Sequence, residues 1–365
     1  MNKIDYTIEK TDASNDPILG SYLALLFKGD SIDNSIVNTL RRVSLSEIPI
    51  YAISESSVYI KKNTSIYDND YMRQRLSMIP LRNLDYAEKF DCLESKYYPY
   101  VSGVYGLIYP DKEYPKDPRD TLDLKIYINV TNENTNVLSV TTNDCKVYVD
   151  NKEVDYVFDK KYPRALLKLR KGQEFKADIH ATLGIAKVHD AWSAISMPAY
   201  RQINANEYSL TINSLGQMNE YTILRKACQW VKLKLENTKK ALNSNPKATG
   251  SKDISTIVLE LENENHTLGN LLKTTLNRHS KVNFSGYKKD HPQMEVITIA
   301  LSTQKIEPFT IINECIDYLL ELFDTIYNNL TEVEQGKKLT KKLKSVKTKT
   351  KGKPSTTKKT KTKTI

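Results

Sequence analysis

Apolar and polar positions follow two different periods along the chain, and these periods separate expected helices from expected strands. Near the N-terminus, four apolar residues fall at three- and four-residue steps, the spacing of one helical face: Ile36, Val37, Leu40 and Val43. Asp33 offers an oxygen that can accept the first free N–H groups of a helix, and Pro49 follows the pattern. The spacing therefore predicts a helix over 33–46.

The same pattern returns in the last third of the chain. The stretch 266–276 aligns with the first helix at a constant offset, which places Asn270 on Asn38 and Lys273 on Arg41. Two copies of a capped short helix between strand-like runs indicate two related folding units.

Two longer segments carry apolar residues at alternating steps of four and three. The stripe of the first contains Leu224, Cys228, Val231 and Leu235, and the stripe of the second contains Ile312, Ile316, Leu319, Phe323 and Ile326. A seven-residue apolar repeat is typical of a helix that packs against a second helix. The matching helix of the other half is the nearest partner, so we expect these residues to form an intrachain pseudo-dimer interface, without a homo-oligomer.

Strand-like runs fill most of the remaining sequence and suggest a division into domains. Tyr and Pro become frequent after Asn83, and clean two-residue alternation follows until about Tyr200, which is typical of an inserted, mostly β module. The expected fold class is α+β. We expect a discontinuous first dimerisation domain (1–82 and 201–243) that holds an inserted β-rich domain (83–200). A linker (244–253), a second dimerisation domain (254–330) and a disordered tail (331–365) follow.

The charge of the chain is concentrated at its C-terminal end. The 365 residues carry a formal charge of +10, but the stretch from Thr331 onward holds thirteen Lys and two Glu, leaving 41 basic and 42 acidic residues elsewhere. Lys/Thr repeats cannot bury enough apolar surface to become ordered. An alternative function is therefore an accessory nucleic-acid-binding protein that contacts DNA or RNA through Lys337 to Lys363.

The sequence offers little material for metal or cofactor sites. The four cysteines stand far apart, without a Cys-x-x-Cys pair or a histidine at ligand spacing: Cys92, Cys145, Cys228 and Cys315. No window holds the roughly 20 apolar residues that span a bilayer. The start lacks a secretory pattern, so we expect an intracellular protein without a metal, a cofactor or a membrane contact.

Motifs in both halves resemble the α-like assembly subunits of multisubunit DNA-dependent RNA polymerase. Segments 38–49, 63–65, 75–81 and 184–194 are similar to the larger α-like subunit, the third of eukaryotic polymerase II. Segments 262–272 and 282–287 resemble the smaller α-like subunit, the eleventh. Their occurrence in one chain resembles the arrangement in polymerases of large cytoplasmic DNA viruses.

The resemblance implies a non-catalytic assembly platform on which the two large catalytic subunits associate, with small polymerase subunits as further partners. It implies a large-subunit interface made of Asn38, Arg41, Arg42, Thr267, Gly269, Asn270 and Lys273. Gly269 is expected to let another backbone approach closely. The implied location is a viral factory in the host cytoplasm, the virion, or otherwise a nucleus.

The resemblance has departures. Many relatives bind zinc through a cysteine cluster in the insert domain, whereas only Cys92 stands near that place, so no metal is expected here. Gln74 and Ser77 replace the usual His and Gly.

An enzyme is the poorest reading of the sequence. It contains no phosphate-binding glycine loop, no carboxylate triad that would hold Mg²⁺, and no nucleophile with an adjacent base. His189 beside Asp190 is the nearest approach to a catalytic pair, and packing near Trp192 explains it better.

Overall fold

A computed structural model describes most of the chain. The described residues are 3–16, 20–84, 86, 89–93, 117–244, 248–250, 256–292, 294, 296–304 and 307–336. The Tyr- and Pro-rich stretch 94–116 and the Lys-rich tail from 337 onward, for which we expected a loop and disorder, lie outside the described residues.

The first dimerisation domain is an antiparallel sheet combined with two helices. The sheet order is β1-β2-β11-β10, formed by β1 (Thr7–Asp16), β2 (Gly20–Lys28), β11 (Glu207–Ser214) and β10 (Ala199–Asn204). The helices are α1 (Asn34–Ser46) and α3 (Glu220–Ser244). Asp33 caps α1 by accepting the backbone N–H of Ile36 at 3.0 Å, as the sequence predicts.

The second dimerisation domain repeats this plan. Its sheet order is β12-β13-β15-β14, formed by β12 (Ala248–Gly250), β13 (Thr256–Glu262), β15 (Val296–Thr303) and β14 (Val282–Lys288). The helices are α4 (His266–Asn277) and α5 (Pro308–Glu334). Two predicted boundaries need correction, because β12 lies inside the expected linker 244–253 and α5 continues past the expected domain end at 330.

The insert domain contains a five-stranded sheet, a two-stranded sheet and a short helix. The sheets have the orders β3-β9-β4-β6-β7 and β5-β8, formed by β3 (Ile50–Asn63), β9 (Glu174–Gly184), β4 (Leu124–Thr131), β6 (Cys145–Val149), β7 (Lys152–Val154), β5 (Leu138–Thr141) and β8 (Ala165–Leu169). The helix is α2 (Asn69–Ser77), and single 3-10 turns lie at Thr142–Asp144 and Asp190–Trp192.

The predicted start of the insert domain at residue 83 is wrong. Strand β3 pairs with β9 from Ile50 opposite Gly184 to Asn63 opposite Phe175, so the insert sheet already begins at residue 50. The change in Tyr and Pro content therefore does not mark the start of the domain. The true boundary depends on strand pairing between residues far apart in sequence, which composition does not report.

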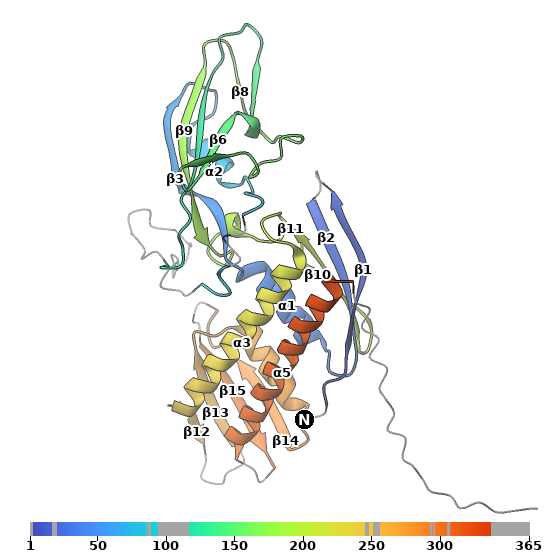
Figure 1. Ribbon diagram of the computed structural model, residues 1–365. Coiled ribbons are helices and arrows are strands. Elements are labelled where there is room, and N and C mark those ends of the chain that lie inside the picture. Colours follow the sequence, from blue (N-terminus) through green and yellow to red (C-terminus); the bar gives the residue numbers. More distant parts are fainter. Residues whose placement is uncertain are drawn as a thin grey trace, which may run out of the picture.

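The two halves are joined through their helices. Figure 1 shows α3 and α5 side by side, with the insert domain projecting beyond the first sheet. Helix α5 reaches β1 of the first sheet, and the Asn329 side-chain N–H donates to the hydroxyl of Tyr6, the residue before β1, at 3.0 Å. The nine stripe residues are all buried, with at most 4% of each exposed. The predicted α+β architecture with two dimerisation units in one chain is confirmed.

Candidate functional site

The short helices α1 and α4 lie against each other and run antiparallel; we call this pair the helix seam. At one end, the Arg42 side chain donates through Nε to the Thr267 hydroxyl at 2.9 Å. At the other end, Arg278 pairs with the Asp33 carboxylate at 3.1 Å and donates to the Asp30 carbonyl at 2.6 Å. The seam therefore joins the first half to the second through a polar contact at each end.

The outer face of α1 carries the residues that the sequence singled out. Asn38 and Arg41 are half-buried and interact within the helix, because Arg41 Nε donates to the Asn38 side-chain oxygen at 3.0 Å. This contact orients the Arg41 guanidinium, whose remaining donors suit carboxylates or carbonyls.

The corresponding face of α4 is only partly open. Asn270 and Lys273 are half-buried, but Thr267 is only 7% exposed and its hydroxyl already accepts from Arg42. The structure thus places Arg42 and Thr267 against each other, across the seam.

The expected role of Gly269 is corrected. This glycine is buried, and a Cβ atom there would lie 2.7 Å from Cδ2 of the Tyr287 ring and 3.2 Å from Cδ1 of Ile297. Both neighbours belong to the sheet of its own domain. Gly269 therefore lets α4 pack on that sheet and does not leave room for the backbone of another chain.

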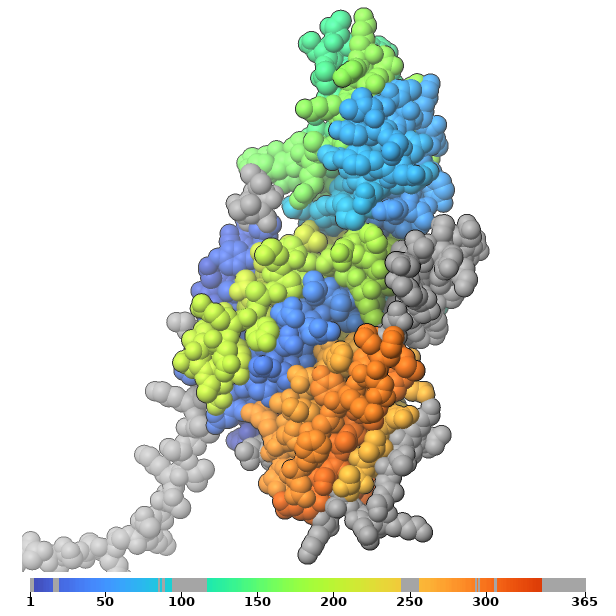
Figure 2. Space-filling model, turned by 180° about the vertical axis from the view of Figure 1, so that it is seen from behind, coloured from blue at the N-terminus to red at the C-terminus, as the bar shows by residue number. Residues whose placement is uncertain are grey.

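Residues of both halves meet on one surface at the helix seam. Figure 2 shows the segment around α1, in blue, next to the orange part of the second domain and the yellow-green strands of the first. A partner that covers this surface would contact both dimerisation units at once.

The long helices form a second, larger contact between the halves. They run antiparallel, as cross-helix ion pairs at three levels show: Arg225 with Glu334, Lys232 with Asp324, and Lys239 with Asp317 at 2.5 Å. In each pair the base comes from α3 and the acid from α5. These ion pairs flank the buried stripe.

Each long helix buries one cysteine, Cys228 in the stripe of α3 and Cys315 on α5. Burial raises the pKa of the Cys228 thiol well above its ordinary value, and burial raises the pKa of Cys315 to about 12. Both thiols are therefore protonated and act as small apolar side chains.

An ion pair between half-buried Lys234 and buried Glu264 connects α3 to the second domain. Lys234 Nζ lies 3.2 Å from the Glu264 carboxylate and donates to the Asn263 carbonyl, also at 3.2 Å. Burial raises the pKa of Glu264, and the nearby Lys234 opposes that shift without cancelling it.

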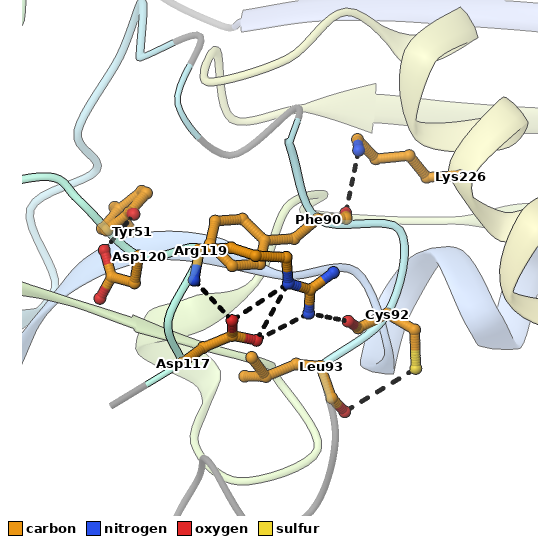
Figure 3. A network of polar contacts seen from close by, with 8 residues as sticks. All are labelled: Tyr51, Phe90, Cys92, Leu93, Asp117, Arg119, Asp120 and Lys226. Atoms are coloured by element: carbon orange, nitrogen blue, oxygen red, sulfur yellow. Dashed lines mark hydrogen bonds and ion pairs between the residues drawn. The ribbon is translucent and has the colours of Figure 1, made fainter. Parts of the chain in front are cut away.

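The insert domain is fastened to α3 by a polar network (Figure 3). Lys226 is only 3% exposed and donates to the Phe90 carbonyl at 2.9 Å. Arg119 binds the Asp117 carboxylate at 2.6 Å, donates to the Cys92 carbonyl at 3.1 Å, and lies over the Phe90 ring.

The described groups beside Cys92 do not form a set of zinc ligands. Among the described residues, the groups near Cys92 include the Arg119 guanidinium, which donates to the Cys92 carbonyl, and the Asp117 carboxylate that pairs with this guanidinium. A guanidinium donates hydrogen bonds and cannot ligate a cation. Throughout the residues that the structure describes, no three His, Cys, Asp or Glu side chains gather in a way that could hold a metal ion.

His189 has a structural position. Its ring Nδ1 accepts the backbone N–H of Ala191 at 3.1 Å, and its ring meets Trp192 edge-on at a centroid distance of 6.1 Å. It therefore caps the short turn Asp190–Trp192.

None of the described helices is long and apolar enough to cross a membrane.

Sequence reasoning missed the residues that fix the two halves in place. Arg278 and Lys234 each contact a partner more than 25 positions away, and neither belongs to a periodic pattern or a motif. Among these residues and their partners, only Asp33 carried a signal in the sequence. That signal was its capping character, which indicated the start of a helix and not a contact between the two halves.

Comparison with known proteins identifies the family. The RNA polymerase Rpb3/Rpb11 dimerisation domain matches residues 27–235 and, a second time, residues 256–329. The chain is 28% identical over 319 residues to a protein of Acanthamoeba polyphaga mimivirus provisionally named DNA-directed RNA polymerase subunit R470, covering 82% of this chain and 88% of that one.

Cellular relatives match about half of the chain. The DNA-directed RNA polymerase subunit Rpo3 of Methanocaldococcus jannaschii is 28% identical over 203 residues, 56% of this chain and 82% of its own length. The DNA-directed RNA polymerases I and III subunit rpac1 of Dictyostelium discoideum is 34% identical over 182 residues, 48% of each chain. Because one match spans more than half of the chain and a second covers the other unit, the chain belongs to the family of RNA polymerase Rpb3/Rpb11 dimerisation domains.

Proposed function

We propose that this chain is the non-catalytic assembly platform of a multisubunit DNA-directed RNA polymerase. In this proposal the two large catalytic subunits associate on it, and the helix seam is part of the surface that they contact. Membership in the dimerisation-domain family and relatives named as polymerase subunits support the coarse role.

The composite nature of the seam is the observation that carries the proposal. Half-buried polar residues of α1 and α4 come from equivalent positions of the two units, and Arg42 links them across the seam. Neither half alone offers this combined surface. A large subunit that recognises it would bind only the correctly joined chain, which is what an assembly platform requires.

The chemistry of the seam suits a protein partner. Arg41 is held by Asn38 on a rigid helix, so its planar guanidinium is presented at a low cost in side-chain entropy. Lys273 adds a second cation on the neighbouring helix. We expect a docking surface on the large subunit with carboxylates or carbonyl groups opposite these two side chains.

The test is affinity capture of the tagged full-length chain from its native source, followed by identification of the large polymerase subunits. We expect the wild type to recover both large subunits and Arg41→Ala/Arg42→Ala to recover at least tenfold less of them. The matched control is Lys168→Ala/Arg170→Ala, which removes two exposed cations from the insert domain and should change nothing.

The single variants separate docking from seam stability. Arg41→Ala removes only a contact within α1, the one between Arg41 and Asn38. Arg42→Ala removes the contact with Thr267 across the seam. Loss with Arg41→Ala alone would support direct docking. Equal capture by the wild type and the double variant would contradict the named surface, and a wild type that recovers no large subunit would contradict the platform role.

Catalysis is assigned to the large subunits in this proposal. The purified chain should therefore transfer no nucleotides on its own. Nucleotidyl transfer by the isolated chain, retained after further purification, would overturn the proposal.

A further inference from the structure

The connection between β3 and α2 displays apolar side chains that no described element covers. Ile66 is 66% exposed, Tyr67 38% and Tyr71 42%, and the two tyrosine rings stack at a centroid distance of 4.9 Å. We call these three residues the β3–α2 knob. Single exposed apolar residues are ordinary, but a cluster on one turn is typical of an interaction site.

The turn that carries the knob is held rigidly by Asn63. Its side-chain oxygen accepts from the Ser65 N–H at 3.0 Å and from the Ser65 hydroxyl at 2.7 Å. Its side-chain N–H groups donate to the Tyr67 carbonyl and to the Asn69 side chain, both at 2.9 Å. One half-buried amide thus fixes three positions of the turn through four hydrogen bonds.

The two ends of the turn are fixed as well. The Thr64 hydroxyl accepts the backbone N–H of Glu174 at 2.8 Å, which ties the turn to β9. The Asp68 carboxylate accepts the N–H of Tyr71 at 2.7 Å and so caps α2. These contacts give a physical reason for the Asn-Thr-Ser motif at 63–65. This motif is not part of the helix seam.

A rigid exposed knob has the properties of a binding hot spot. Tyrosine contributes a large contact area with few rotatable bonds, and a surface that is already ordered loses little entropy on association. The polar contacts of the turn therefore hold three apolar side chains in an exposed position. At that position these side chains add little apolar burial to the stability of the fold.

The charges around the knob favour a protein over a nucleic acid or an anionic membrane. Asp68 and Asp70 are exposed beside the knob, and Asp70 is paired with Arg73 at 2.7 Å. Exposed Lys62 nearby is paired with Glu174, so the charges around the knob are balanced and leave no excess of cations to bind phosphate groups. Figure 2 shows β3 and α2, in blue and cyan, on the outer surface of the insert domain and apart from the helix seam.

We propose that the β3–α2 knob inserts into an apolar pocket on another protein subunit of the polymerase. The identification of the partner as a polymerase subunit rests on the proposed function. It assigns to the insert domain a docking contact that is separate from the seam.

The test places a photo-crosslinker at the knob in the assembled complex. The tagged chain carrying Ile66→p-benzoylphenylalanine is captured from its source, irradiated and analysed for covalent adducts. Val137→p-benzoylphenylalanine is the matched control, because Val137 is 60% exposed on the same domain. We expect an adduct with one polymerase subunit at position 66, at least tenfold above the control.

A second measurement uses Ile66→Ser/Tyr67→Ser, which leaves the backbone carbonyl bound by Asn63 in place. We expect unchanged thermal unfolding of the purified chain and at least tenfold lower recovery of the crosslinked subunit. Val137→Ser should leave that recovery unchanged.

The outcomes separate the two proposals. An adduct no stronger than the control, an adduct with nucleic acid or with a second copy of this chain, or unchanged recovery by the serine variant would overturn the knob proposal. If the wild type recovers the large subunits in any of these cases, the platform role stands. If it recovers none, the platform role fails by itself.

Discussion

The two helix pairs that join the halves differ in kind. The α3/α5 pair buries a continuous apolar stripe, in which Leu319, Phe323 and Ile326 have no exposed surface. The α1/α4 pair is joined at its ends by directional polar contacts, from Arg42 to Thr267 and from Arg278 to Asp33. One pair supplies most of the apolar burial, and the other defines how the two units are oriented.

The difference follows from the physics of the two kinds of contact. Apolar burial is non-directional and scales with area, so a regular stripe tolerates small shifts along the helix axis. Hydrogen bonds require a narrow range of distance and angle. Contacts at both ends of the seam therefore set the register of α1 against α4, and with it the composite surface that we propose for docking.

The largest expected effect concerns the apolar pair. Phe323→Ala should lower the free energy of unfolding by about 3–5 kcal/mol, because it removes a fully buried aromatic side chain and leaves a cavity. Denaturant unfolding of the full chain measures the change. Leu233→Ala on the outer side of α3, where Leu233 is 38% exposed, should change the free energy by less than about 0.5 kcal/mol. Similar losses in both variants would remove the distinction between the stripe and the rest of the helix.

A smaller effect is expected at the seam. A double-mutant cycle of Arg42→Ala and Thr267→Val should give a coupling energy of about 0.5–1.5 kcal/mol in equilibrium unfolding, near the lower end because Arg42 is exposed. The control cycle of Arg41→Ala and Thr267→Val should give none, since the Arg41 side chain contacts Asn38 on its own helix. Equal coupling in both cycles would show that the seam contact is not specific.

The buried Glu264 should reveal itself as a pH dependence. Its pKa is raised above the ordinary 4.5 by burial, so the folded chain holds a proton that the unfolded chain has released, and stability falls as pH rises through the raised pKa. Glu264→Gln removes this dependence, so its stability relative to the wild type should increase as pH rises from about 4.5.

The matched control for this titration is Glu260→Gln, an exposed position on β13. Unfolding of this variant over the same pH range is the reference for the loss of one carboxyl group. A flat stability difference for Glu264→Gln, measured by unfolding at each pH, would show that Lys234 fully compensates the burial.

The smallest expected effect lies on the rim of the α3/α5 pair. Lys239→Met removes the ion pair with Asp317, whose side chains are 32% and 57% exposed, and should lower stability by about 0.2–1 kcal/mol at low salt. In high salt the difference should disappear. Lys240→Met, at an exposed neighbour, is the control. A loss that persists in high salt would indicate that the methylene chain of Lys239 contributes through packing.

Several elements were predictable because their signals are local. The helix caps, the three- and four-residue steps of α1 and the seven-residue stripes each depend on residues within a few turns. The start of the insert domain at Ile50 was not predictable in this way, because β3 finds its partner strand β9 more than 100 residues later. Gly269 was misread because the ring that covers this position of α4 comes from Tyr287 on strand β14.

The sequence by itself determined the elements, the two related units and the apolar stripes that bring them together, because periodicity and capping are properties of neighbouring residues. Only the tertiary structure decided which polar groups meet across the halves, which glycine is covered and which apolar groups stay exposed. Those outcomes depend on pairwise contacts such as Arg278 with Asp33 and Lys234 with Glu264. The reason is physical: hydrogen bonds and ion pairs need two groups at one distance and angle, and the chain reaches that geometry only after its apolar surfaces have packed.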